Sequence, residues 1–173
     1  MTAPTVPRFN EAMWVAGYYL SFAVHMISMD QGVFRPVGGS VRDGKTFLRS
    51  FDAKRMEVAA AEGRTWLESN PDHLDHAVLL FDGYYNLPNR KVDALCAEIV
   101  DYAQPRQNLR VALPYRPVTS AAGLAIYRLK VILENEADMN GETAQILGQT
   151  LMDGFEAYSE GFDIWKQHQD ESI

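Results

Sequence analysis

The chain has 173 residues, an apolar fraction of 47% and a formal net charge of −7. This length and composition are typical of one soluble globular domain and exclude a disordered chain. The acidic balance disfavours nucleic-acid binding, because a phosphate backbone attracts basic surfaces. We expect one α+β domain over residues 1–173, with residues 1–9 flexible and residues 169–173 frayed. The single cysteine excludes an intramolecular disulfide, which favours a cytoplasmic location.

The first predicted element is a helix over residues 10–29, with Asn10 as its N-cap. Residues 12–29 contain no Asp, Glu, Lys or Arg, which approaches the length of a membrane-spanning helix. Polar residues within this run and tyrosines at its middle argue against a membrane segment. The helix is apolar on two opposite faces, so it must be enclosed by its own chain or half-covered by a second subunit in a homodimer. The stripe proposed for the dimer contains Met13, Leu20, Val24 and Ile27.

A hairpin and a second helix are predicted next. Residues 33–41 and 45–51 are extended segments joined by an Asp-Gly pair, which is typical of a tight β-turn. Asp52 is the expected N-cap of a helix that continues to about Asn70, where the following proline ends it.

The rest of the chain predicts a meander and a last helix. Residues 77–85, 109–115 and 124–133 have the length and composition of strands. Residues 91–102 have helical spacing but the position of a meander strand, so both interpretations stay open, with strand preferred. A long amphipathic helix is expected over residues 140–168. The predicted fold is therefore α+β: an antiparallel sheet of roughly five to six strands, hairpin plus meander, covered by three helices.

Residues 39–46 match the phosphate-loop pattern G-x-x-x-x-G-K-[ST]. In such a loop the backbone at Gly39 and Gly44 wraps the phosphates, Lys45 reaches their oxygens, and Thr46 binds Mg²⁺. This match supports an alternative function, a nucleotide-binding enzyme.

The surroundings of this pattern favour a hairpin instead. Arg35 and Pro36 interrupt the segment that should be a buried parallel strand, and Asp43 adds a negative charge beside the phosphates. Asp82 follows an apolar run, as the Mg²⁺-binding aspartate of such enzymes does, but residues 71–133 predict strands without the alternating helices that the fold requires.

A weaker candidate site comes from a repeated pattern, aromatic-Arg-Pro-Val, at residues 34–37 and 115–118. If the two loops met, Arg35 and Arg116 could hold a carboxylate or phosphate, with Tyr115 and Asp82 as further ligand-binding candidates. The alternative is coincidence, or an arginine stacked on its aromatic neighbour.

No set of residues predicts catalysis, a metal site or a cofactor. His73 and His76 lack the further ligands that zinc requires, Cys96 has no base beside it, and His25 is expected in the core. The chain is rich in aromatic residues, which are favoured at interface cores. We therefore expect a non-enzymatic module that binds a ligand or a protein partner.

Overall fold

The structure is a computed structural model that describes residues 9–29, 34–43, 45–132 and 141–173. It confirms the α+β fold: the described residues form four helices and one antiparallel sheet of seven strands. The strand order is β2-β1-β3-β4-β5-β6, and β7 also pairs with β5. The elements are α1 (Asn10–Ile27), β1 (Val37–Arg42), β2 (Lys45–Ser50), α2 (Met56–Ser69), β3 (His76–Asn86), β4 (Lys91–Asp101), β5 (Gln107–Arg116), β6 (Ala125–Ile126), β7 (Lys130–Ile132), α3 (Gly141–Ala157) and α4 (Ser159–His168).

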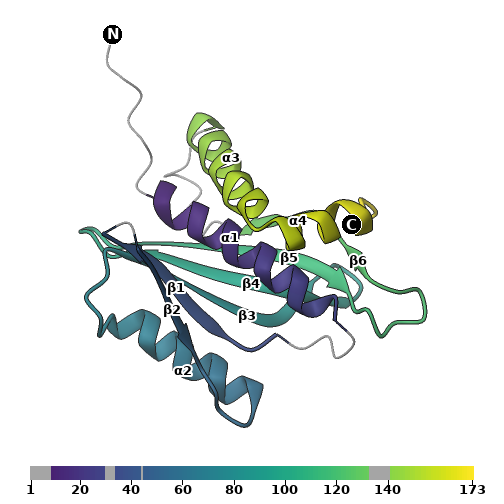
Figure 1. Cartoon of the computed structure of the whole chain (residues 1–173), viewed down its shortest axis with the longest axis horizontal. Coiled ribbons are helices and arrows are strands. Elements are labelled where there is room, and N and C mark those ends of the chain that lie inside the picture. The colour runs from purple at the N-terminus through teal and green to yellow at the C-terminus, as the bar shows by residue number, and fades with distance from the viewer. Residues whose placement is uncertain (1–8, 30–33, 44, 133–140) are drawn as a thin grey trace.

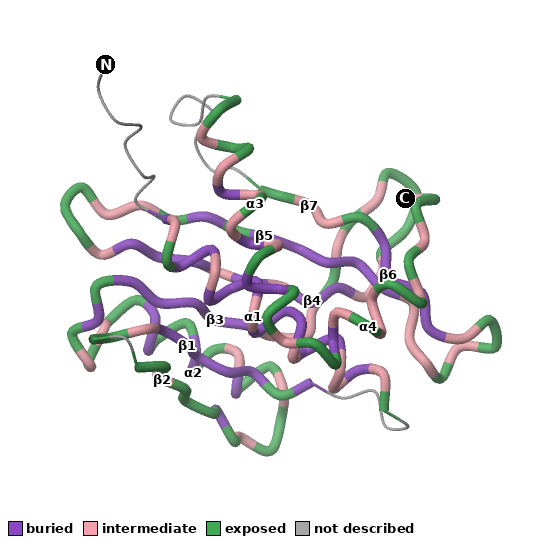
Figure 2. The backbone as a smooth tube through the Cα atoms, turned by 45° about the horizontal axis from the view of Figure 1, so that its top comes forward, coloured by how far each residue is buried: buried purple, intermediate pink, exposed green. Residues whose placement is uncertain are grey.

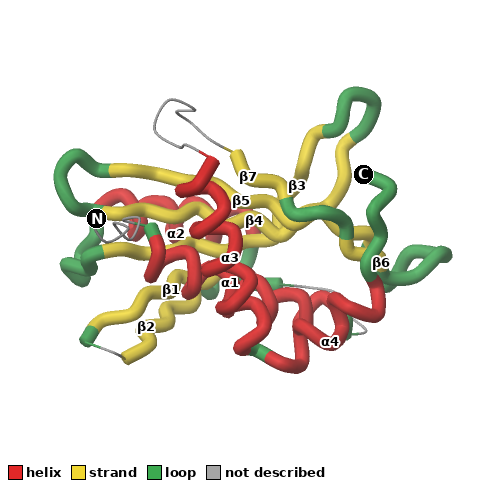
Figure 3. The backbone as a smooth tube through the Cα atoms, turned by 90° about the horizontal axis from the view of Figure 1, so that it is seen from above, coloured by secondary structure: helices red, strands yellow, loops and turns green. Residues whose placement is uncertain are grey.

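The helices lie on both faces of the sheet, with α1, α3 and α4 above it and α2 below it in Figure 1. Figure 3 shows α1 and α3 lying over the strands, with the C-terminus near β6. Side chains alternate between the two faces of a strand. On β3, Val78 and Leu80 therefore join the core under α1, while Ala77 and Leu79 join the core over α2. Figure 2 shows β3, β4 and β5 largely buried and β2 mostly exposed.

The first helix is enclosed by its own chain. Met13 is 2% exposed, and Leu20, Val24 and Ile27 are fully buried. The stripe from which a homodimer was expected is therefore already covered, so α1 offers no exposed patch of these residues to a second subunit. Among the described residues, no helix is both long and apolar enough to cross a membrane.

Glycines let the three helices on this face approach closely. A Cβ built on Gly17 would lie 1.9 Å from the backbone oxygen of Leu151 on α3. A Cβ on Gly154 would lie 2.0 Å from the backbone oxygen of Trp14. A backbone atom cannot move aside as the end of a flexible side chain can. A larger residue at either position would therefore force α3 away from α1.

The last helix was predicted as one element over residues 140–168, and the structure corrects this. Tyr158 leaves the helical conformation and separates α3 from α4. Its backbone oxygen accepts a hydrogen bond from the Ser21 hydroxyl of α1 at 2.8 Å as well as one from the Phe162 N–H of α4 at 3.2 Å. An amphipathic pattern can continue through such a break, which explains why three helices were expected and four are found.

Three helix and strand limits also differ from expectation. The second helix begins at Met56 with Arg55 at the N-cap position, so Asp52 is not its cap. In the first helix Phe9 takes the N-cap position, and the Asn10 side chain instead accepts a hydrogen bond from Thr150. The single strand predicted over residues 124–133 is replaced, in its described part 124–132, by two short strands, β6 and β7. The preferred strand over 91–102 is confirmed as β4.

The C-terminal residues were expected to fray, but they are held against β6. Gln169 forms a bridge with Ile126, and the Asp170 N–H donates to the Ile126 oxygen at 2.9 Å. Of the segment 1–9 that was predicted to be flexible, residues 1–8 lie outside the described residues, whereas Phe9 is buried.

Candidate functional site

The phosphate-loop pattern lies on a β-hairpin. Gly39 is in β1, whereas Lys45 and Thr46 are in β2, and Arg42 pairs with Lys45 across the turn. Asp43 has a φ of 50°, in the left-handed region that tight turns use. A phosphate loop requires a helix N-terminus directly after its Lys-Thr, and a strand follows here instead. Gly44 lies outside the described residues.

The two aromatic-Arg-Pro segments do not form a paired arginine site. Strands β3 and β4 lie between β1, which Arg35 precedes, and β5, which ends at Arg116. The Arg116 guanidinium donates to the backbone oxygens of Gly123, at 2.8 Å, and Ala122, at 3.3 Å. Arg35 is exposed. The guanidinium of Arg116 thus bonds to the backbone of the loop that follows β5.

The other two candidates, Tyr115 and Asp82, are brought together. The Tyr115 hydroxyl donates to the Asp82 carboxylate and lies 2.8 Å from Oδ1 and 2.9 Å from Oδ2. Tyr115 is buried, and Asp82 is partly exposed. Burial raises the pKa of Asp82 to about 6, although the hydrogen bond from Tyr115 opposes this and the charge of Asp93 adds to it.

The histidines and the cysteine take structural positions. His25 is within 2.9 Å of the Tyr158 hydroxyl, His73 is exposed and His76 is buried. Burial raises the pKa of the Cys96 thiol to about 11, so it is not an activated nucleophile. Within the described residues, no group of three His, Cys, Asp or Glu side chains could hold a metal ion.

A hollow with a volume of about 550 Å³ lies on the lower face of the sheet, beside α2. Its floor is a row of cross-strand neighbours, in which Phe81 pairs with Cys96 and Cys96 pairs with Ala112. Gly83 continues the floor along β3. Small side chains at Gly83, Cys96 and Ala112 leave this space open beside α2.

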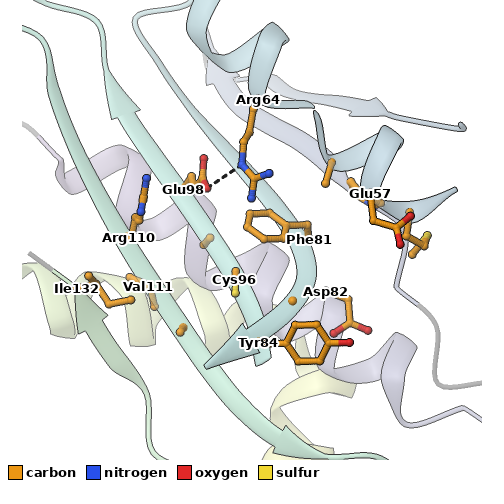
Figure 4. A pocket seen from close by; sticks show the side chains of 16 residues that line it. Glu57, Arg64, Phe81, Asp82, Tyr84, Cys96, Glu98, Arg110, Val111 and Ile132 are labelled. Atoms are coloured by element: carbon orange, nitrogen blue, oxygen red, sulfur yellow. Dashed lines mark hydrogen bonds and ion pairs between the residues drawn. The ribbon is translucent and has the colours of Figure 1, made fainter. Parts of the chain in front are cut away.

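One wall of the hollow is a single side of α2. Met56, Ala60 and Arg64 are four residues apart and therefore lie along one face of the helix. Ile132 on β7 forms the opposite wall and is 40% exposed. Figure 4 shows Arg64 and Phe81 on one side of the hollow and Ile132 on the other.

Charged groups are arranged around the apolar floor. The Arg64 guanidinium lies 4.7 Å from the centre of the Phe81 ring, and its Nε donates to Glu98 Oε1 at 3.2 Å. Glu98 in turn lies opposite Arg110 in the sheet. Asp82 and Tyr84 line the far end of the hollow (Figure 4). The site therefore combines an apolar surface with both signs of charge at its rim.

Of these lining residues, sequence reasoning selected only Asp82 as a ligand-binding candidate. It missed the set formed by Arg64, Phe81, Glu98, Arg110 and Ile132. The sequence feature that could have pointed to these residues is the alternation of polar and apolar residues in β4 and β5. Such alternation is typical of a sheet with one partly uncovered face. Comparison with protein-family models, curated proteins and solved structures finds no match to this chain.

Proposed function

We propose that this chain is a non-enzymatic cytoplasmic binding module that holds a small, partly apolar molecule in the hollow beside α2. The observation that carries this proposal is the hollow itself, whose volume of about 550 Å³ lies in the usual range of small-molecule sites. Such sites are concave, largely apolar and lined by a few polar groups that orient the ligand. The cytoplasmic location is supported by the single cysteine.

The lining indicates the kind of ligand. The row Phe81, Cys96 and Ala112 offers a flat apolar floor to an aromatic or aliphatic body. Arg64 can then contact an anionic or hydrogen-bonding group of the ligand, because its side chain is about half exposed beside the floor. A flat molecule with one polar end would use both features.

Binding can be tested with the fluorescent dye anilinonaphthalene sulfonate, which has an apolar ring system and one anionic group. We expect saturable fluorescence enhancement with the native chain and its loss in Ala112→Trp, because an indole would fill the hollow. Val58→Trp is the matched control, since Val58 is exposed on α2 and does not line the hollow. Cooperative melting of each variant excludes dye binding to a loosened state. Equal enhancement by both tryptophan variants would contradict the proposal.

A second candidate function, acid–base catalysis, is favoured by Asp82. Asp82 is one of the residues around the hollow, and the pKa of its carboxyl, about 6, suits proton transfer near neutral pH. Both of its oxygens already contact Tyr115, which leaves binding as the better-supported function. If the hollow is catalytic, molecules that displace the dye should be converted by the native chain and not by Asp82→Asn. Displacement without conversion would support the binding module.

A further inference from the structure

The edge strand β2 has backbone groups that no strand formed by the described residues uses. It pairs with β1 alone, at the end of the strand order. The Phe51 N–H donates to the Pro36 oxygen at 3.2 Å. In an antiparallel pair of strands, every second residue of a strand is hydrogen-bonded to its partner strand, so this bond shows which residues of β2 bond to β1. Residues 45, 47 and 49 consequently bond to β1, whereas Thr46, Leu48 and Ser50 direct their N–H and C=O groups away from the sheet.

The two faces of β2 differ in chemistry. A Cβ on Gly38 would contact Trp66 of α2, and Gly38 pairs with Arg49, so Arg49 and Lys45 lie on the face toward α2. Leu48 lies on the opposite face and is 53% exposed. Lys45 is exposed, and Arg49 remains half exposed although it forms an ion pair with Asp72 at 3.7 Å. The face toward α2 thus carries two basic side chains on either side of Phe47, and the opposite face carries the exposed Leu48 between Thr46 and Ser50.

This basic edge stands out in an acidic chain. Six of the 16 lysines and arginines, but only two acidic residues, lie between residues 35 and 55, while the whole chain has a net charge of −7. A second copy that paired through the same edge would bring like charges together, which is unfavourable. An acidic strand would instead gain charge complementarity together with main-chain hydrogen bonds.

We propose that β2 binds an extended acidic segment of another protein, which adds to the sheet as a further strand. The segment alternates acidic and apolar residues. Its acidic side chains lie beside Lys45 and Arg49, its apolar side chains pack beside Leu48, and its backbone bonds to the outward groups of Thr46, Leu48 and Ser50. Strand addition of this kind takes affinity from the main chain and specificity from alternate side chains. This interaction is separate from ligand binding in the hollow.

A fluorescein-labelled peptide of alternating Glu and Val, six residues long with blocked ends, tests the proposal. We expect it to bind at least about tenfold more tightly than the matching Lys and Val peptide, with affinity falling as salt is added. In amide hydrogen exchange, bound peptide should protect the N–H groups of Thr46, Leu48 and Ser50. Equal binding of the two peptides, or no protection of these amides, overturns the proposal.

Two variants test the geometry. Leu48→Pro removes one outward N–H but no bond to β1, and should weaken acidic-peptide binding by about tenfold or more. Lys45→Glu should weaken it similarly without altering the backbone, whereas Lys166→Glu on α4, with the same change in net charge, should not. Equal effects of the two charge reversals overturn the proposal. Self-association of the chain that Leu48→Pro abolishes would instead identify a second copy as the occupant and overturn it.

Discussion

Tyr115 on β5 and Asp82 on β3 are joined by a hydrogen bond that crosses the intervening strand β4, with the phenol oxygen 2.8 Å from Oδ1 of the carboxylate. The long tyrosine side chain makes this reach possible. Burial raises the pKa of Tyr115, and the neighbouring charge of Asp82 raises it further. Tyr115 belongs to the core under α1, so the pair holds a partly buried acid on that face of the sheet.

The first prediction concerns the dependence of stability on pH. The pKa of Asp82 is about 6 in the folded chain, above its usual value of 3.8, so the folded state holds this proton more tightly than the unfolded state does. The contribution of Asp82 to the free energy of unfolding therefore falls as pH rises from about 4 to about 6, and then stays constant.

In Asp82→Asn the side chain does not ionise, so the free energy of unfolding no longer falls between about pH 4 and about pH 6 because of this residue. The asparagine keeps an oxygen that can accept the Tyr115 hydrogen bond. We expect the variant to be more stable than the native chain by about 1–2 kcal/mol above pH 7, after allowing for solvent screening, and equally stable near pH 4. Urea unfolding across this pH range measures the difference. Asp75→Asn, at an exposed position, is the control, and a gain of the same size there would contradict the assignment.

Two glycines of α3 should respond to alanine in opposite directions. Gly148→Ala meets no atom within 4 Å and should stabilise the chain by about 0.5–1 kcal/mol, because alanine favours a helix. Gly154→Ala would place its Cβ 2.0 Å from the Trp14 backbone oxygen and should cost roughly 3 kcal/mol. Thermal or urea unfolding compares the two. Equal effects would show that α3 does not pack against α1 as closely as described.

The hairpin at residues 39–46 should not bind nucleotide. Lys45→Ala changes an exposed strand residue, so we expect a change in stability within about 0.5 kcal/mol. Millimolar ATP with Mg²⁺ should leave the melting temperature unchanged in both forms. An ATP-dependent rise that Lys45→Ala removes would support the phosphate-loop alternative.

Leu20→Glu tests the enclosure of α1. Leu20 is fully buried within the chain, so an unpaired carboxylate there should cost several kcal/mol and unfold the protein. Circular dichroism and light scattering measure folding and mass together. A folded variant at 19.5 kDa, beside a native form of twice that mass, would show instead that this stripe joins two subunits.

The elements themselves could be predicted from local patterns. Short apolar runs between turn signals indicated the strands, the Asp-Gly turn at residues 43–44 indicated the hairpin, and spacing of three to four residues indicated the helices. These signals depend on which face of each segment must be buried, and that is a property of a few neighbouring residues. The α+β fold follows from the order of the segments along the chain.

Only the tertiary structure decided the candidate site. Phe81, Cys96 and Ala112 become neighbours through the registers of β3, β4 and β5, and Arg64 joins them because α2 packs beside β3. The break at Tyr158 likewise lies against Ser21 of α1, which is 137 residues away in the chain and donates to the Tyr158 oxygen. Periodicity shows which side of a strand or helix is apolar, but strand register and helix placement depend on packing between segments distant in sequence.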